Sequence, residues 1–577
     1  MTEQGKFSLK QQRRNRSAWW RYGAIALLLL GIALRLYHLD YKVYWLDEAY
    51  TSLRLSGHTR AEFEQTVFTG DVVDWATLQR YQHPSPDKTL GDTLHSIAAE
   101  EPQLTPLYFV LTYGWIMLFG HSITAIRSLA VLFSLLAFPC LWWLCRELFP
   151  AAKTAWMAIA IFAVAPLHLL YAQEARPYSL WTLTILLSSA TFLWAIRTKA
   201  PWHWAIYALT VSLGLYTQLL FALVAIAHGL YLFLLCRHST SNPQSAQSPR
   251  HPRFAQSAQS PPSPRPAHPA VPYLLATLTA CLPLVPWLAI LTSNLDQAQA
   301  RISSLDESSS LSAVFNQWLV NTGRGLLGVD LGPVNLLLLV GVGYALLVFY
   351  RTAPRPAALF VLSLAGVSFL SLAVPDLLLG GDRSTRIRYL IPAYLAVQLA
   401  LAQVFSTQVL TIASSNASSN ARSNARSNLG LRRQRGWQLG LALLLSVSLG
   451  VGLISAQSRV WWNKSVPRSS YYLPVSSMIN QGDRPLVISD RRPIDLLALS
   501  YWLDDDVKFQ LIFPPQTLAV APGFAPIFLL NASNRLKKNL AQQGYGLTLR
   551  YTDDNAPKAE RERLWQLSLK SNAIVER

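Results

Sequence analysis

The chain has 577 residues, of which 51% are hydrophobic and only 14% are charged, and its formal net charge is +19. A soluble domain usually carries about 25% charged residues, so the composition excludes an ordinary soluble enzyme. Most of the sequence consists of apolar runs of roughly 17 to 25 residues, each long enough to cross a bilayer as a helix. The basic residues are spread over the short loops between these runs, which favours a role in membrane topology over nucleic-acid binding.

The placement of charge predicts how the chain begins. Residues 1–21 hold six basic residues and one acid, so we expect a cytoplasmic basic N-terminus followed by a retained signal-anchor. The loop 40–123 has eleven acidic and five basic residues and is expected on the outer face. Its apolar segment 104–120 is short, and treating it as an interfacial helix with both ends outside lets the later short loops obey the positive-inside rule.

Residues 22–456 are therefore predicted to form a transmembrane domain of about eleven helices. Two low-complexity linkers, 238–270 and 411–436, interrupt it and are expected to be disordered in the cytoplasm. The expected spans are 22–39, 124–145, 154–171, 178–196, 203–216, 218–236, 272–291, 333–350, 357–374, 388–410 and 437–456.

The composition changes after the last span. Within residues 457–577, five short apolar runs predict strands and two stretches predict helices, which is typical of a small α/β domain. Because the N-terminus is expected in the cytoplasm and about eleven crossings follow, we expect this domain outside the cytoplasm. The expected strands are 485–490, 507–513, 525–530, 545–551 and 563–569, and the expected helices are 494–503 and 534–543.

Polar residues gather in the predicted outer loops. Asp47 and Glu48 follow the first span, and two carboxylates beside a bilayer are costly without a partner or a chemical role. The alternative is an acidic pair that only stabilises the start of a helix. Glu174 and Arg176 lie between the third and fourth spans, where the guanidinium is a candidate phosphate ligand or a snorkelling arginine paired with its neighbour.

A third cluster, which contains Arg386, Arg388 and Tyr389, precedes the tenth span. Its three arginines break the positive-inside trend locally, so we expect an anionic partner there. Arg35, near the outer end of the first span, is a further candidate, although snorkelling explains it equally well. A carboxylate and an arginine site on one face suit a transferase that uses a lipid-phosphate-linked donor.

Several segments in this order resemble the GT-C superfamily of membrane glycosyltransferases, and most closely the protein mannosyltransferase-like, glycosyltransferase family 39-type enzymes. They are the Asp-Glu pair after the first span, EPQLTPLYFVLTYGWIMLFG with SITAIRSLAVLFSLL, LHLLYAQEARPYSL and RIRYLIPAY. The resemblance covers about residues 20 to 410.

The resemblance implies an inverting transfer of a sugar from a polyprenyl-phosphate donor to an acceptor hydroxyl on the outer face of the plasma (inner) membrane. Asp47 matches the catalytic base and Glu48 its companion, while Arg176, Arg386 and Arg388 match positions that hold the lipid phosphate. Many relatives carry His-Pro-Pro before the interfacial helix, whereas this chain does not, and Glu101 is the substitute that we expect there.

Other functions stay open at this point. A lipid-linked sugar transporter or flippase would also have many spans, but it predicts ionisable residues near the midplane and repeated halves, and neither is found in the sequence. A sensor or assembly protein would leave the outer polar clusters unexplained.

The Asp-Glu pair is a candidate ligand for a divalent cation, with no further ligands identified. The acceptor, whether protein, lipid or polysaccharide, is not predicted.

Overall fold

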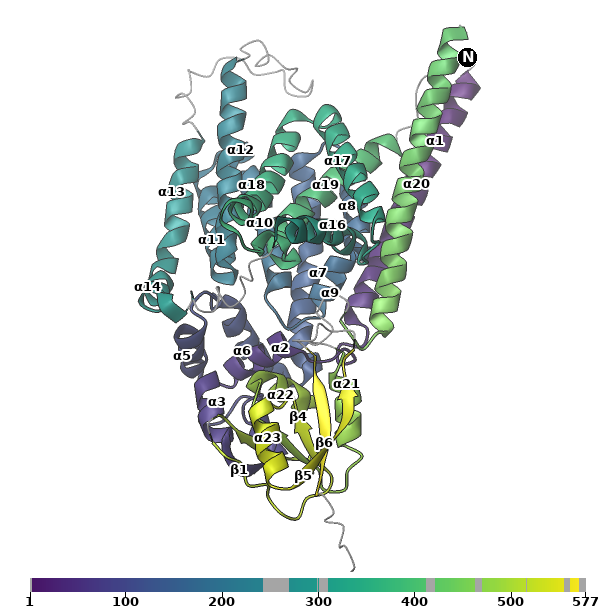
Figure 1. The fold of residues 1–577 in the computed structure, drawn as a ribbon. Coiled ribbons are helices and arrows are strands. Elements are labelled where there is room, and N and C mark those ends of the chain that lie inside the picture. Colours follow the sequence, from purple (N-terminus) through teal and green to yellow (C-terminus); the bar gives the residue numbers. More distant parts are fainter. Residues whose placement is uncertain are drawn as a thin grey trace, which may run out of the picture.

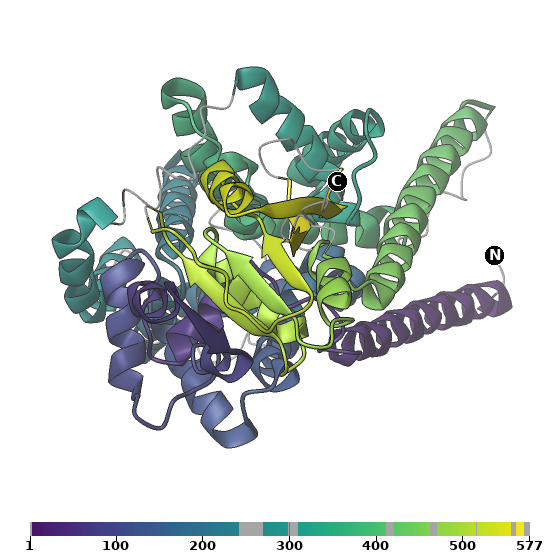
Figure 2. The same ribbon diagram turned by 60° about the horizontal axis from the view of Figure 1, so that its bottom comes forward.

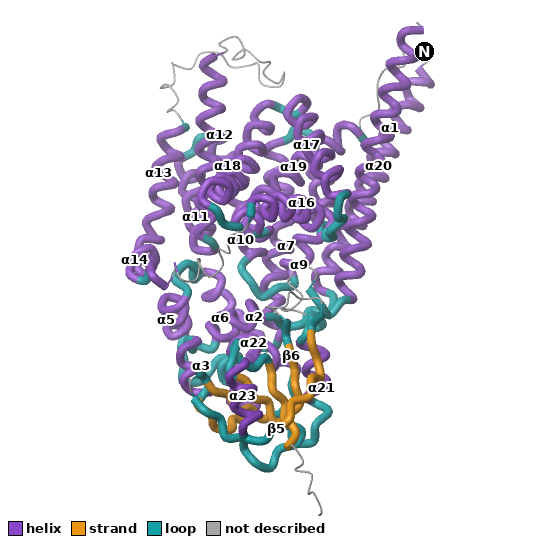
Figure 3. The backbone as a smooth tube through the Cα atoms, viewed as in Figure 1, coloured by secondary structure: helices purple, strands orange, loops and turns teal. Residues whose placement is uncertain are grey.

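The molecule consists of a helical bundle with a smaller sheet domain at one end (Figure 1). The computed structural model describes residues 3–241, 269–297, 299, 310–410, 421–461, 470–514, 516–554 and 561–569. The described strands all belong to the domain at that end (Figure 3). The N-terminus lies at the opposite end of the bundle, as the label in Figure 1 shows.

The bundle is built from long apolar helices. Among the described residues, eight helices are long and apolar enough to cross a membrane, and a bent pair makes a ninth. The helices of the bundle are α1 (Glu3–Leu36), α7 (Ile123–Leu148), α8 (Ala152–Val164), α9 (Pro166–Ala172), α10 (Tyr178–Thr198), α11 (Pro201–Thr217), α12 (Ala222–Ser241), α13 (Ala270–Cys281), α14 (Val285–Ser293), α16 (Leu311–Leu327), α17 (Val334–Thr352), α18 (Arg355–Leu379), α19 (Ile391–Gln408) and α20 (Ala421–Gln457).

The structure confirms a polytopic helical protein but not the count of eleven spans. The predicted spans 22–39 and 203–216 fall on α1 and α11, which are not among the eight, and α11 has only 17 residues. The predicted span 154–171 is broken into α8 and α9, which meet at an angle of 60°. Pro166 explains the break, because its ring removes a backbone N–H and clashes with the preceding turn.

The predicted linkers are only partly visible. Residues 242–268 and 411–420 lie outside the described residues. From Ala421 onward the second linker forms part of the helix α20, and its expected disorder stays a prediction. This stretch is free of proline, and extending an existing helix costs far less than nucleating a new one.

The segment that was expected to lie in the membrane interface forms α6 (Leu107–Phe119). Its 13 residues reach about 20 Å as a helix, which is too short to cross a hydrocarbon core of about 30 Å. The apolar side chains of Met117, Leu118 and Phe119 are exposed at its end. The length argues against a full crossing by α6, and its place in the membrane interface stays a prediction.

The C-terminal domain has the predicted α/β character. All five predicted strands and both predicted helices form, and one further helix, α21 (Tyr472–Ile479), precedes them. The strands β2 and β4 run parallel to each other and β3 runs parallel to β2, while β6 pairs antiparallel with β4 and β5. The elements are β2 (Leu486–Ser489), α22 (Pro493–Leu499), η7 (Ser500–Trp502), β3 (Lys508–Ile512), β4 (Ile527–Leu530), α23 (Asn534–Gln542), β5 (Tyr545–Thr552) and β6 (Arg563–Leu569).

The outer loop completes this sheet. Its strand β1 (Thr69–Asp74) pairs antiparallel with β3, with Val73 opposite Phe509, and the order in the sheet is β1-β3-β2-β4-β6-β5. The other elements of the loop are α2 (Leu46–Leu55), α3 (Arg60–Val67), α4 (Trp75–Gln79) and α5 (Leu90–Glu100).

One hydrophobic core joins the outer loop to the C-terminal domain. It contains Val43 and Phe63 from the loop together with Val487, Leu497 and Phe509 from the domain. Figure 2 shows the yellow-green sheet in front, with the purple and blue helices of the loop along one flank. The residues after 457 therefore fold against the loop that carries Asp47 and Glu48.

Candidate active site

Asp47 lies in the first turn of α2, directly after the chain leaves α1. Its side chain is 18% exposed, and its Oδ2 atom lies 3.3 Å from Nη1 of Arg388. Arg388 belongs to η5 (Ile387–Leu390), the turn that leads into α19. Its guanidinium also lies over the ring of Tyr389, with 5.4 Å to the ring centroid. The predicted acidic and basic clusters thus meet at one point.

Arg176 approaches α2 from the turn between α9 and α10. Its Nη1 atom donates to the backbone oxygen of Asp47 at 3.3 Å and to Oγ1 of Thr51 at 3.2 Å. Burial lowers the pKa of Arg176, but the neighbouring Tyr178 and Asp47 raise it, so that its pKa lies above the usual range. Its Nε atom is buried and has no hydrogen-bond partner among the described residues. A charged guanidinium therefore stands beside Asp47 with unused donor capacity.

Glu48 makes a different contact from its neighbour Asp47. Its carboxylate accepts two hydrogen bonds from Arg127 at 2.8 and 2.7 Å, and both side chains are fully buried. Its Oε1 atom also accepts the backbone N–H of Ala175 at 2.9 Å, next to Arg176. Glu48 therefore ties α2 to α7 and to the turn that carries Arg176.

Arg127 was not among the predicted site residues. It also donates to the backbone oxygens of Leu39, Lys42 and Val43, so it holds the chain between α1 and α2. The sequence does carry a signal for it, because Arg127 is the sole charged residue between positions 123 and 145. A lone arginine in an apolar run needs a buried partner.

The other predicted residues surround this centre or lie apart from it. Glu174 is buried, and its backbone oxygen accepts the N–H of Arg176 at 2.7 Å. Glu101 lies 3.5 Å from the buried Arg54, and its negative charge acts on Arg176. Arg386 pairs with Asp382 at 2.9 Å, so the structure does not bring it onto Asp47.

Arg35 is enclosed within the helical bundle. It donates to Oγ of Ser134 at 2.9 Å and to the backbone oxygens of Gly31, Phe162 and Ala163 at 2.8 to 3.1 Å. The side chain is fully buried, so these contacts use its donors to fasten α1 to α7 and α8. Arg35 therefore contributes to the packing of these three helices.

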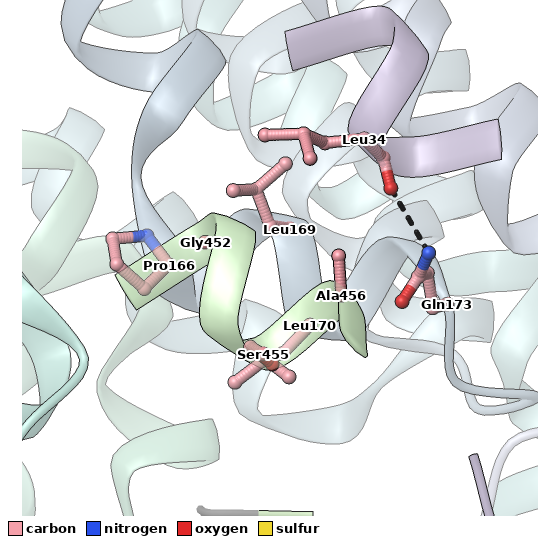
Figure 4. Close-up of a pocket in the computed structure, with 8 residues that line it drawn as sticks. All are labelled: Leu34, Pro166, Leu169, Leu170, Gln173, Gly452, Ser455 and Ala456. Carbon is pink, nitrogen blue, oxygen red and sulfur yellow. Dashed lines mark hydrogen bonds between the residues drawn. The ribbon is translucent and has the colours of Figure 1, made fainter. Parts of the chain in front are cut away.

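A small crevice lies between α1, α9 and α20 (Figure 4). Most of its lining is apolar, and Gln173 donates from Nε2 to the backbone oxygen of Leu34 at 3.0 Å. No acidic or basic side chain is among its lining residues, so we place the candidate catalytic chemistry at Asp47 and not in this crevice. Its lining residues are Leu34, Pro166, Leu169, Leu170, Gln173, Gly452, Ser455 and Ala456.

The side chains around Asp47 do not form a set of metal ligands. Within the described residues, no three side chains of His, Cys, Asp or Glu gather where they could hold a metal ion. Asp47 and Glu48 face different arginines, Arg388 and Arg127. Binding of a divalent cation by the Asp-Glu pair stays a prediction.

Residues 101–245 match the family model of dolichyl-phosphate-mannose-protein mannosyltransferases. This match confirms the predicted resemblance to GT-C glycosyltransferases of the mannosyltransferase type. The matched segment contains Glu101, Arg127, Glu174 and Arg176, whereas Asp47 lies before it. A sequence comparison with curated proteins finds no match.

The chain is also similar to solved structures at low identity. ArnT from Cupriavidus metallidurans in the apo state shares 13% identity and a TM-score of 0.49, over 96% of this chain and 98% of that one. The same protein bound to undecaprenyl phosphate shares 14% identity and a TM-score of 0.46, with equal coverage. The oligosaccharyltransferase of Archaeoglobus fulgidus in the apo form shares 11% identity and a TM-score of 0.45, over 92% and 73% of the chains.

Proposed function

We propose that this protein is a membrane glycosyltransferase that moves a sugar from a polyprenyl-phosphate donor to an acceptor hydroxyl, with inversion at the anomeric carbon. The observation that carries the proposal is that Arg388 pairs with the carboxylate of Asp47 while Arg176 donates to the backbone oxygen of the same residue. The match of residues 101–245 to the mannosyltransferase model supports the same class of reaction.

Asp47 is the proposed base. Its carboxylate takes the proton of the acceptor hydroxyl while the acceptor oxygen bonds to the anomeric carbon of the sugar. The bond between that carbon and the phosphate oxygen breaks, and its electron pair leaves with the polyprenyl phosphate. The acceptor attacks from the side opposite to the phosphate, so the configuration inverts.

Arg176 and Arg388 are the proposed phosphate ligands. Charge builds up on the phosphate as it leaves, and preorganised guanidinium groups stabilise this charge best where water is partly excluded. Arg388 pairs with Asp47 at 3.3 Å. A donor phosphate that attracts Arg388 would release the Asp47 carboxylate for the acceptor, so donor binding and activation of the base are coupled.

We further propose that the site faces the extracytoplasmic side of the plasma (inner) membrane. The basic residues 1–21 favour a cytoplasmic N-terminus, and the sheet domain lies at the opposite end of the bundle (Figure 1). The domain of residues 457–577 and the loop 40–123 then both lie outside. At that level the carboxylate and the arginines meet lipid headgroups, where a lipid-linked donor presents its phosphate.

The test uses purified wild type and Asp47→Asn in lipid vesicles, with radiolabelled polyprenyl-phosphate sugars of several kinds and an envelope extract as acceptor source. Asp40→Asn is the matched control, since Asp40 is exposed and belongs to the same loop. We expect wild type and Asp40→Asn to release polyprenyl phosphate and Asp47→Asn not to. If all three proteins instead moved the labelled lipid across the vesicle membrane without releasing polyprenyl phosphate, the protein would be a carrier and not a glycosyltransferase.

A further inference from the structure

The C-terminal domain contacts the helix that carries Asp47 through one tyrosine. The hydroxyl of Tyr501, in η7, donates to Oγ of Ser52 on α2 at 3.1 Å. The same Oγ atom lies 2.6 Å from the hydroxyl of Tyr44, just before α2. The rings of Tyr44 and Tyr501 pack with their centroids 4.5 Å apart. Ser52 and Tyr44 are fully buried and Tyr501 is half-buried, so this contact is largely shielded from water.

The outer loop holds η7 in place for this contact. Nε1 of Trp75 donates to the backbone oxygen of Ser500 at 3.0 Å, and Nε2 of Gln82 donates to Oγ of Ser500 at 2.6 Å. Gln82 also donates to the backbone oxygen of Leu497 at the end of α22. Tyr501 is therefore fixed from both sides, by its own domain and by the loop.

Ser52 and Asp47 lie on different faces of α2. They are five positions apart, which corresponds to a rotation of about 140° around the helix. Near its start α2 is fixed by the Glu48 and Arg127 pair, while Thr51 donates to the backbone oxygen of Ala175 at 3.1 Å. Ser52 follows Glu48 by one helical turn on the same face, so the contact with Tyr501 restrains α2 further along the helix, and the contacts of Glu48, Thr51 and Ser52 together limit its rotation about its axis.

We propose that Tyr501 is a positioning residue that acts through Ser52 to orient α2 and so to aim Asp47 at Arg176 and Arg388. The C-terminal domain is then a structural part of the catalytic centre rather than a separate module for binding the acceptor. This inference rests on the proposed function for its kinetic consequence, but the restraint of α2 can be measured without any activity.

The first test is hydrogen–deuterium exchange of full-length Tyr501→Phe in vesicles. We expect exchange in peptides covering residues 46–55 to become about 3- to 10-fold faster, because a partly buried hydrogen bond that restrains α2 is lost. Tyr545→Phe is the matched control, since Tyr545 begins β5 at the far edge of the sheet, and it should leave these peptides unchanged. Equal exchange of residues 46–55 in wild type and Tyr501→Phe would overturn the inference.

The second test is kinetic. We expect Tyr501→Phe to lower kcat by about 3- to 10-fold with an unchanged KM for the donor, because the arginines keep their places. Ser52→Ala removes the same contact together with the one to Tyr44, so it should act in the same direction, and the double variant should be no slower than the slower single variant. Additive losses, or a loss in KM alone, would contradict a positioning role. A wild type that releases no phosphate would refute the proposed function instead, while the exchange result would still decide whether α2 is restrained.

Discussion

Oδ2 of Asp47 lies 3.3 Å from Nη1 of Arg388, although 341 residues separate them in the chain. The contact joins the helix after the first span to the turn before α19. Arg176 reaches the same turn of α2 from a third segment. Three distant segments of the chain thus meet at the first turn of α2.

Arg388→Gln should raise the KM for the polyprenyl-phosphate donor by about tenfold or more, because a charge-assisted contact to the phosphate is removed. Arg386→Gln is the matched control, since Arg386 pairs with Asp382 and not with Asp47. Its effect on KM should be smaller than about threefold. Initial rates over a range of donor concentrations give both values, and equal effects of the two substitutions would refute the assignment of Arg388.

Arg176→Ala should also weaken the handling of the donor. It removes the guanidinium whose Nε atom has no partner among the described residues, and with it the bond to the backbone oxygen of Asp47. We therefore expect a higher KM together with a lower kcat. Unchanged dependence of the rate on donor concentration would argue against a phosphate ligand at this position.

Glu48→Gln should destabilise the protein rather than change its chemistry selectively. It leaves the fully buried Arg127 without its counter-charge, which typically costs about 3 to 5 kcal/mol. Glu64→Gln is the control, because Glu64 pairs with Arg60 at a partly exposed site, where such pairs contribute less than about 1 kcal/mol. Thermal unfolding in detergent should show a clearly lower Tm for Glu48→Gln alone, and equal Tm values for both variants would contradict this role.

The stability of the outer loop should fall in mild acid because of His83. Burial, and then the charge of His121, lowers the pKa of His83 to about 4, whereas an unfolded histidine titrates near 6.5. The unfolded state binds more protons between these values, so the free energy of unfolding falls as the pH drops from about 6.5 to about 4. His83→Gln should reduce this slope in Tm measurements across that range. A slope identical to that of wild type would show that His83 is not the group responsible.

Much of this arrangement follows from the sequence. The alternation of apolar runs with turns gave all five strands of the C-terminal domain, and eight of the predicted spans correspond to helices of sufficient length. Asp47, Arg176 and Arg388 were each singled out from their positions in the predicted outer loops. Their residue types and positions were enough to predict that they share one face, whereas the contacts between them come from the structure.

The remaining features depend on tertiary contacts that no local pattern shows. The strand β1 has the sequence TGDVVD, whose glycine and two aspartates disfavour a strand, and it forms because β3 offers a pairing edge. Tyr501 lay inside a predicted helix of residues 494–503. In the structure α22 ends at Leu499 and a tighter turn follows, which directs Tyr501 to Ser52.

The central claim is that Asp47 is the base for transfer from a polyprenyl-phosphate sugar. The most direct measurement is the initial rate of polyprenyl phosphate release by wild type, Asp47→Asn and Asp40→Asn at saturating donor, with equal amounts of folded protein in the vesicles. The account predicts that Asp47→Asn is slower than wild type by more than about 100-fold, while Asp40→Asn matches wild type. Release by Asp47→Asn at the wild-type rate would contradict it.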